Sequence, residues 1–357
     1  MNSHIPIKNL YYFLAYAFSA LKDNNYSNLK NEDFDSAEDL FAEILILAVS
    51  KQLKQGLKRG YLLIEEEISS VRGKILLAES FKEGSLQRKK IVCSHDEYNE
   101  DCYFNRIIKT TLILLLKSGI SKDRKSKIRH LLKFFENVSE LNPHRINWKQ
   151  QYDRNSATYR LIIYICNLLV NSKIQSNSKD GKSLEDYIDE RELSHLYEKF
   201  ILEFYRRHYS NELSADDSQI KWDVSNVESD DLYLLPSMKS DITLTSKTSR
   251  KVLIIDAKFY SQSLQKRFDK FSIHSGNLYQ IFTYVKNKTY ASSDREVSGL
   301  LLYAKTDHEL QPKAKFKMSG NDISVDNLDL STDFSLIKEK LDSIVQNLIR
   351  SDFKCIN

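Results

Sequence analysis

The stretch KSDITLTSKTSRKVLIIDAKFYS, from Lys239 to Ser261, contains two short apolar segments separated by a polar turn. Two such segments around a turn predict a β-hairpin. The second segment, Val252–Ile255, is apolar throughout, yet it runs directly into Asp256 and Lys258. Because residues two apart on a strand face the same side, the carboxylate and the amine are expected to project together.

A second carboxylate lies in the same hairpin. With a turn centred near residues 247–248, Asp241 falls opposite Ile255 or Asp256, and the sequence leaves this register open. Either register brings two carboxylates and one amine to the same end of the hairpin. Neighbouring carboxylates repel each other and are costly to bury, and a bound Mg²⁺ or Mn²⁺ would remove that cost. The pattern predicts metal-dependent phosphodiester hydrolysis, with Lys258 orienting the attacking water.

The neighbouring helices offer further candidates. On the helix expected over residues 190–209, Glu203 lies at the edge of the apolar stripe and is favoured as an accessory carboxylate. Glu198 projects farther from that stripe, but the choice between the two stays open. Gln280 and Tyr284 are four residues apart and share one face of a later helix. We expect them to contact the lysine, the waters around the metal or the DNA backbone.

A basic segment follows the hairpin directly. Lys266, Arg267 and Lys270 are candidates for contacts with DNA phosphates. Each feature also has a simpler interpretation: a surface salt bridge for the hairpin, a solvated face for the helix, and solubility for the basic segment. The combination, in this order of helices and strands, is more specific than any one member.

The order of elements predicts two domains with mixed α and β structure. Residues 1–173 are expected to form a mainly helical domain with a small β insertion at about 61–95. Residues 174–187 are poor in apolar side chains and are predicted to be a linker. Residues 188–357 follow the order helix, three strands, helix, strand, which predicts an αβββαβ domain.

Composition limits the classes of function. The 357 residues carry a net charge of +4, which permits nucleic-acid binding without arguing for it. The segment around Gly181 resembles the end of a phosphate-binding loop, but Ser176 stands where the loop needs its first glycine. Any nucleotide hydrolysis is therefore assigned to a partner. The four scattered cysteines, with no secretion signal and no membrane span, suggest a cytoplasmic protein.

Three short stretches resemble the core of the PD-(D/E)xK nucleases. They are Asp241-Ile-Thr-Leu, the segment Ile-Ile-Asp256-Ala-Lys258-Phe-Tyr, and a RecB-like Gln-x-x-x-Tyr helix at Gln280 and Tyr284. Further stretches resemble McrC, the nuclease subunit of the McrBC modification-dependent restriction system, over nearly the whole chain: Ile5–Phe18, Val71–Ile75, Asn99–Leu112 and Leu234–Leu244. The proline of the nuclease name is absent, since a serine precedes Asp241.

This resemblance implies an endonuclease that uses Mg²⁺ to cut double-stranded DNA carrying modified cytosine. Residues 188–357 would hold the PD-(D/E)xK domain, with Asp241 and Asp256 as metal ligands and Lys258 as the catalytic lysine. The N-terminal half would dock onto an McrB-like hexameric AAA+ GTPase and stimulate it, so that GTP enters only through the partner. The resemblance places the protein in the bacterial cytoplasm and leaves dimerisation of the nuclease domains open.

The β insertion is the candidate for the surface that meets the partner. Arg72, Gly73 and Lys74 are the residues assigned to that contact, and an ordinary tight turn is the alternative. Two other functions remain open at this point. The chain would be a nuclease-inactive activator of the partner GTPase, or a stand-alone RecB-like nuclease that processes DNA.

Overall fold

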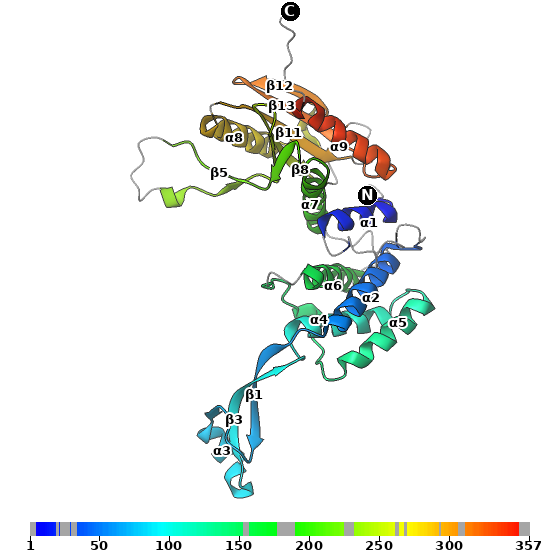
Figure 1. Ribbon diagram of the computed structural model, residues 1–357, viewed down its shortest axis with the longest axis vertical. Coiled ribbons are helices and arrows are strands. Elements are labelled where there is room, and N and C mark those ends of the chain that lie inside the picture. Colours follow the sequence, from blue (N-terminus) through cyan, green and yellow to red (C-terminus); the bar gives the residue numbers. More distant parts are fainter. Residues whose placement is uncertain are drawn as a thin grey trace, which may run out of the picture. The chain divides into compact units, whose positions relative to one another are not determined.

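The chain folds into two compact units (Figure 1). The computed structural model describes residues 5–18, 21, 29, 34–152, 157–176, 190–224, 232–260, 264–267, 270–292, 294–305 and 311–349. We call residues 1–23 together with 188–357 the sheet unit, and residues 24–187 the arm unit. Among the described residues, no helix combines the length and the apolar character needed to cross a membrane.

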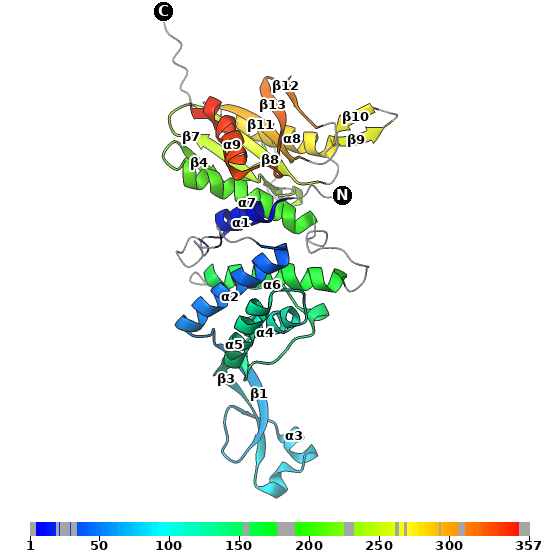
Figure 2. The same ribbon diagram turned by 90° about the vertical axis from the view of Figure 1, so that its right-hand side faces the viewer.

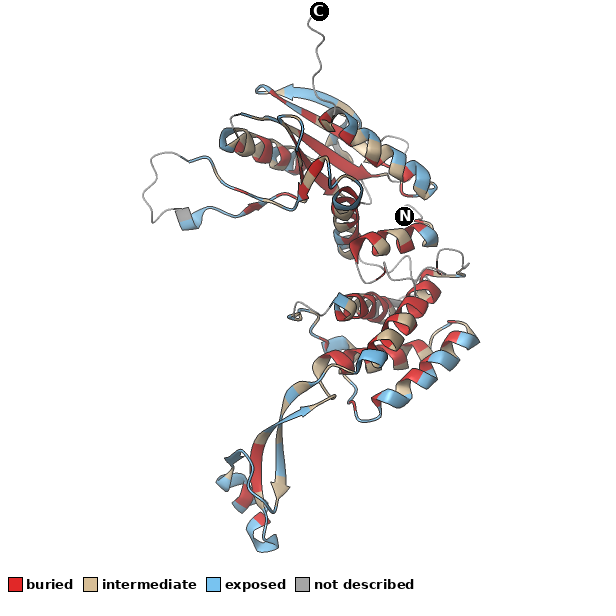
Figure 3. Cartoon of the chain, in the orientation of Figure 1, coloured by how far each residue is buried: buried red, intermediate tan, exposed pale blue. Residues whose placement is uncertain are grey.

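The sheet unit is built on a mixed six-stranded sheet. In spatial order its strands are β12 (Ala314–Met318), β13 (Asn321–Leu328), β11 (Glu296–Ala304), β8 (Lys251–Lys258), β7 (Ile242–Ser246) and β4 (Leu213–Asp216). Strand β11 runs parallel to both β8 and β13, whereas the other pairs are antiparallel. The two central strands, β8 and β11, are apolar and almost wholly buried, as parallel strands covered on both faces must be (Figure 3).

The hairpin expected from the sequence is confirmed as β7 and β8. Ile242 pairs with Ile255, and the pairing continues through Thr245 opposite Val252. One step further in this register, Asp241 comes level with Asp256. The structure thus selects one of the two registers that the sequence left open.

Helices cover both faces of this sheet. Helix α8 (Ser275–Ala291) contacts β8 and β11 on one face, where Ile281 and Val285 enter the main core. Gly299 on β11 allows this close approach, because an added Cβ would lie 2.8 Å from a Val285 methyl carbon. Helices α7 (Glu190–His208) and α9 (Phe334–Ile349) contact β8, and Figure 1 shows α8 and α9 on opposite sides of the sheet.

Smaller elements complete the sheet unit. Two ribbons of paired strands are β5 (Gln219–Ile220) with β6 (Met238–Lys239) and β9 (Leu264–Arg267) with β10 (Lys270–Ile273). A short 3₁₀ helix, η7, spans Leu232–Leu234. The order α7, β4, β7, β8, α8, β11 contains the helix, three strands, helix and strand that the sequence predicted, with the two ribbons as additions.

The N-terminal helix corrects the expected domain boundary. Helix α1 (Ile7–Ala17) was assigned to the N-terminal domain, but it belongs to the sheet unit. Its Phe13 ring lies 4.5 Å from the ring of Phe200 on α7, and the Tyr16 hydroxyl is 2.7 Å from Nε2 of His208. The aromatic stripe of α7 needs a cover on its outer side, and α1 supplies it (Figure 2).

The arm unit combines a helical bundle with a β extension. Its helices are α2 (Ala37–Gln55), α4 (Tyr103–Leu116), α5 (Lys122–Leu132) and α6 (Ala157–Ser176), with 3₁₀ helices η4 (Lys133–Phe135) and η5 (Pro143–Arg145). The predicted linker at 174–187 begins inside α6, and residues 177–187 lie outside the described part of the chain.

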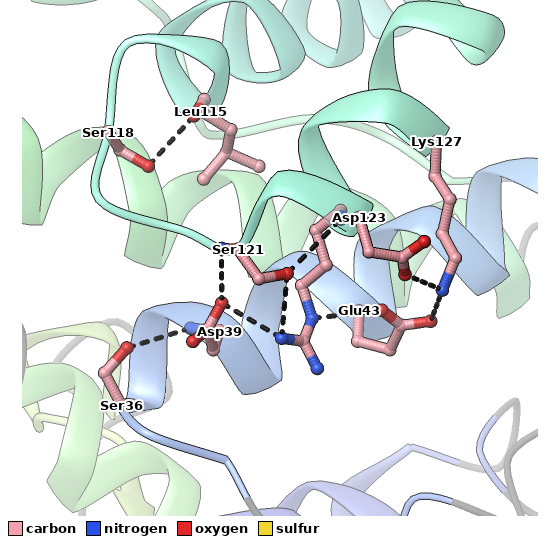
Figure 4. A network of polar contacts seen from close by, with 9 residues as sticks. Ser36, Asp39, Glu43, Leu115, Ser118, Ser121, Asp123 and Lys127 are labelled. Carbon is pink, nitrogen blue, oxygen red and sulfur yellow. Dashed lines mark hydrogen bonds and ion pairs between the residues drawn. The ribbon is translucent and has the colours of Figure 1, made fainter.

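A buried ion network joins α5 to α2 (Figure 4). The Arg124 guanidinium lies 3.1 Å from an Asp39 carboxylate oxygen and 3.0 Å from a Glu43 oxygen, and all three residues are less than a tenth exposed. Lys127 adds a second cation 3.3 Å from Glu43. Buried charges are tolerated only when they are paired in this way, so the network fixes how the two helices meet.

The β insertion expected at about 61–95 forms an arm, residues 60–99. Strands β1 (Gly60–Ile68) and β3 (Ile91–Asn99) pair along their whole length. Strand β2 (Lys74–Ile75), helix α3 (Leu77–Lys82) and the 3₁₀ helix η3 (Ser85–Arg88) complete the arm. The arm extends away from the helices of its unit, and much of its surface is exposed (Figure 3).

One buried amide holds both ends of the arm at its root. Asn105 on α4 donates from Nδ2 to the carbonyl oxygens of Lys58 and Glu100, each at 2.8 Å. The Tyr159 hydroxyl on α6 donates to Asn105 Oδ1 at 2.9 Å and accepts from the Lys58 N–H at 2.7 Å. The arm therefore leaves the helical bundle from a fixed base.

Replacing Phe13 by alanine is expected to destabilise the sheet unit rather than the arm unit. The Phe13 side chain is buried against Phe200, and loss of a buried phenylalanine costs about 3–5 kcal/mol. Hydrogen exchange should speed up in peptides from α7, while peptides from α4 and α6 keep their protection. Lys8→Ala, on the exposed side of the same helix, serves as the control. Unchanged exchange in α7 would contradict the packing of α1 on this unit.

Candidate active site

The two aspartates and the lysine of the hairpin meet at one end of β8. Asp241 Oδ2 accepts a hydrogen bond of 2.9 Å from the N–H of Ala257. Asp256 Oδ2 lies 2.8 Å from the Lys258 Nζ atom. Asp256 is completely buried, and the Lys258 side chain is 12% exposed. The convergence predicted from the hairpin is thus present in the structure.

Burial makes ionisation of this carboxylate pair costly. It raises the pKa of Asp241 to about 8, and the charges of Asp256 and Glu198 act in the same direction. Burial also raises the pKa of Asp256, although the neighbouring Lys258 amine opposes the change. For Lys258 itself, burial lowers the pKa, but attraction to Asp256 outweighs it and leaves the pKa raised. One cation therefore faces two carboxylates that repel each other.

The donor set fits a hard divalent cation. Asp256 Oδ1 is buried and accepts no hydrogen bond, although buried carboxylate oxygens normally have partners. Within the described ranges, no cluster of three or more His, Cys, Asp or Glu side chains is arranged to bind a metal. Asp241 and Asp256 would therefore supply two carboxylates, with water or substrate oxygens completing the shell, as Mg²⁺ sites commonly do.

Helix α8 adds an ordered chain of polar contacts. Lys258 Nζ donates to Gln280 Oε1 at 3.2 Å, and Gln280 Nε2 donates to the Tyr284 hydroxyl at 2.9 Å. Because the tyrosine takes the amide nitrogen, the carbonyl oxygen of Gln280 is turned toward the lysine. Of the contacts expected for Gln280, the structure shows the one with the lysine.

Both accessory candidates, Glu198 and Glu203, line a cavity with Asp241, but they differ in their charge contacts. Glu203 Oε1 accepts from Arg206 at 2.9 Å and belongs to an ion cluster with Asp217. Glu198 is the residue on α7 whose charge raises the pKa of both Asp241 and Asp256. The sequence shows that Glu203 lies beside the apolar stripe that contacts the sheet. It does not show which turn of α7 passes the end of β8, because that depends on where the helix crosses the sheet.

Two cavities share His195 and Glu198 in their walls, and the smaller one reaches Asp241. The smaller, of about 330 Å³, is also lined by Asp241 and by Lys199, Arg206 and Lys239. The larger, of about 600 Å³, is also lined by Arg191, Ser194, Phe259 and Tyr260. The sequence analysis missed His195 and Tyr260. The sequence spacing could have indicated both residues. His195 precedes Glu198 by three residues and so shares its helix face, and Tyr260 follows Lys258 by two residues.

The remaining candidate residues lie elsewhere. Lys266, Arg267 and Lys270 belong to the β9–β10 ribbon, and their side chains fall outside the described part of the structure. Arg72, Gly73 and Lys74 lie in the arm and are exposed. At Gly73, φ is +65° and a Cβ would lie 2.4 Å from the carbonyl oxygen of Ser94. Backbone geometry therefore explains this glycine, while Arg72 and Lys74 stay candidates for partner contacts.

Comparison with known proteins identifies a restriction system. A family model described as "McrBC 5-methylcytosine restriction system component" matches residues 4–304. The "Type IV methyl-directed restriction enzyme EcoKMcrBC" of Escherichia coli (strain K12) is 31% identical over 350 residues, which cover 97% of this chain and 99% of that protein.

Two solved assemblies show weaker likeness. In a half-complex from the tetradecameric assembly of Thermococcus gammatolerans McrB AAA+ hexamers with bound McrC, the match has 17% identity and a TM-score of 0.47, over 95% of this chain and 76% of that one. A second Thermococcus gammatolerans McrBC complex matches at 16% identity and a TM-score of 0.37, over 50% of this chain and 60% of that one.

Replacing Asp241 by asparagine is expected to stabilise the metal-free sheet unit at pH 8. The folded-state pKa of Asp241 is about 8, above the unfolded value of about 3.9. The stability contributed by its protonated form is therefore complete below pH 4 and is lost as the pH rises through 8. The amide does not ionise, so the free energy of unfolding should rise by about 1–3 kcal/mol at pH 8 and by less at pH 5.

Chemical unfolding in EDTA at the two pH values measures this difference. Asp322→Asn makes the same chemical change at an exposed position of the same unit and should alter stability at neither pH. Equal stability of Asp241→Asn and the wild type at pH 8 would mean that the carboxylate pair carries no burial cost.

Proposed function

Because the chain belongs to the family of McrBC 5-methylcytosine restriction system components, we propose that it is the DNA-cutting subunit of such a system. Residues 188–357 would act as a PD-(D/E)xK endonuclease domain, with α1 as part of its core. The observation that carries the proposal is the set of Asp241, Asp256 and Lys258 at the end of a buried strand. A fold has no structural need to bury two repelling carboxylates, whereas a metal-dependent nuclease does.

Asp241 and Asp256 would hold Mg²⁺, with Mn²⁺ as an alternative for the same oxygen ligands. The bound ion would polarise the scissile phosphate and lower the pKa of a coordinated water. The free lone pairs of Asp256 Oδ1 support this assignment. Glu198, on the cavity side of the pair, would bind or orient water rather than replace either aspartate.

Lys258 would act on the reacting atoms. Its amine lies 2.8 Å from Asp256 and donates to Gln280 at 3.2 Å, so two acceptors fix its position. A fixed ammonium group here would orient the attacking water and stabilise the negative charge that grows on the phosphate oxygens. Gln280 and Tyr284 would keep the amine in place, which makes them positioning residues.

The arm is the part that we assign to docking on an McrB-like hexameric AAA+ GTPase. Its distal half exposes large apolar side chains, with Val71 at 57%, Leu77 at 57% and Phe81 at 70% exposure. A cluster of this kind typically marks a protein interface. Arg72 and Lys74 lie exposed beside it. Docking would stimulate the partner's GTPase, and the complex would act on methylcytosine DNA in the bacterial cytoplasm.

Asp256→Asn should abolish cutting without affecting the partner. In the complex reconstituted with the partner GTPase, GTP and Mg²⁺, cleavage of methylated plasmid should fall by at least about 100-fold, the scale of losing a main electrostatic element of a site. The arm is untouched, so stimulation of GTP hydrolysis should stay at the wild-type level. Asp322→Asn, an exposed aspartate of the same sheet, is the matched control.

Three contrary outcomes would each lead to a different conclusion. Full cutting by Asp256→Asn would refute the proposed site. Stimulated GTP hydrolysis with no cutting by the wild type would make the chain a GTPase activator. Equal cutting with and without the partner would make it a stand-alone DNA-processing nuclease.

Tyr284→Phe should lower the cleavage rate by about 10-fold. The variant keeps the buried ring and removes only the hydroxyl that accepts from Gln280. Without it, the Gln280 amide can turn and the lysine amine is less well placed, and small errors in placement are costly in catalysis. Tyr279→Phe, on the exposed side of the same helix, should leave the single-turnover rate unchanged. Equal rates for the two variants would remove Tyr284 from the site.

A further inference from the structure

The larger cavity beside the carboxylates has no role in the function proposed so far. Its volume of about 600 Å³ falls within the range of sites that hold small organic groups, about 300–1,000 Å³. It opens between the start of α7 and the residues that follow β8, and it meets the smaller cavity at His195 and Glu198. Phe259 and Tyr260 in its wall follow Lys258 directly in the chain, so a group bound there would lie near the candidate site.

The depth of the site favours such a group. Asp256 is completely buried and Lys258 is 12% exposed, so a phosphate must enter the protein surface to reach them. In a regular duplex, the nucleotide attached to that phosphate is stacked and paired. If a neighbouring nucleotide turned out of the stack, the backbone could bend inward and bring the phosphate closer to these residues.

The lining of the cavity suits a nucleobase better than a second phosphate. Glu192 and Glu198 offset the charge of Arg191 in this wall, so it lacks the excess of positive charge that would favour a phosphate. The Ser194 hydroxyl donates to Glu198 at 3.2 Å and can still accept from the edge of a base, and His195, whose Nδ1 faces Glu198, can offer its other ring nitrogen. The face of Tyr260 offers a stacking surface, which accepts any base.

Tyr260 is held in place by its neighbours. Its ring lies 5.7 Å from that of His274 and 6.4 Å from that of Tyr303, and its hydroxyl is 3.5 Å from Asn277 Oδ1. It is nevertheless 37% exposed. A fixed, partly exposed aromatic ring is a platform that loses little conformational freedom when a base stacks on it.

We propose that this cavity binds the nucleobase next to the scissile phosphate, turned out of the DNA stack and placed against the ring of Tyr260. The inference rests on the proposed nuclease function and adds a substrate-binding residue to it. It also implies that the strand is distorted locally before it is cut.

A double-mutant cycle between protein and DNA tests the contact. The reconstituted complex cuts a methylated duplex whose cleavage position has been mapped. In a series of otherwise identical duplexes, each nucleotide within three positions of the cut is replaced by an abasic tetrahydrofuran residue. Single-turnover rates are measured for the wild type, Tyr260→Ala, Tyr260→Leu and Tyr260→Phe. Tyr279→Ala is the control, because this exposed tyrosine of α8 lines neither cavity.

We expect one position beside the cut to be sensitive. The abasic residue there should slow the wild type by about 10-fold, within the range for losing a base–aromatic stack. Tyr260→Ala and Tyr260→Leu should slow cleavage of the intact duplex by a similar factor, with no further loss on that abasic duplex. Tyr279→Ala should behave as the wild type does on both, and Tyr260→Phe, which keeps the ring, should keep the sensitivity to that abasic position.

Two results would overturn the inference while leaving the nuclease function standing. The first is a rate that depends on no single abasic position. The second is a rate loss for Tyr260→Ala on the abasic duplex that equals the product of the two separate losses. Tyr260 and the base would then act independently. Absence of cutting by the wild type on every duplex would instead remove the proposed function, and this inference with it. Thermal unfolding of Tyr260→Ala and Tyr260→Leu identifies any loss that comes from misfolding.

Discussion

The register between β7 and β8 is the constraint on which the site depends. Pairing of Ile242 with Ile255 brings Asp241 level with Asp256, and the N–H of Ala257 then holds the first carboxylate beside the second. Two carboxylates so placed are expensive in a buried environment, as the raised pKa values of both show. The surrounding sheet has to supply enough apolar burial to offset that cost, and its central strands do so.

The same site depends on α7, and through it on α1 from the N-terminal end of the chain. Helix α7 covers the sheet and lines both cavities, and its aromatic side is completed by α1. The arm unit is therefore inserted between two parts of one folding unit. Such an insertion is connected to its host by two chain segments instead of one.

The arm shows a different use of polar groups. Its strands expose much of both faces, so little apolar burial holds it together. Its direction is set at the root, where Asn105 binds the backbone on both sides of the hairpin. A stiff base with an exposed distal surface is what a docking element requires, because a mobile arm would lose more entropy on binding.

The sequence by itself determined the hairpin, the convergence of Asp241, Asp256 and Lys258, and the shared helix face of Gln280 and Tyr284. All of these follow from local periodicity, which sequence expresses directly. Tertiary structure alone decided that α1 joins the sheet unit, because an aromatic stripe shows that a helix is covered but not by what. It also brought the charge of Glu198 close to both aspartates, and it brought His195 and Tyr260 to one cavity. The last two outcomes depend on where α7 crosses the sheet. That crossing point brings α7 close to the ends of particular strands, and no local sequence pattern encodes it.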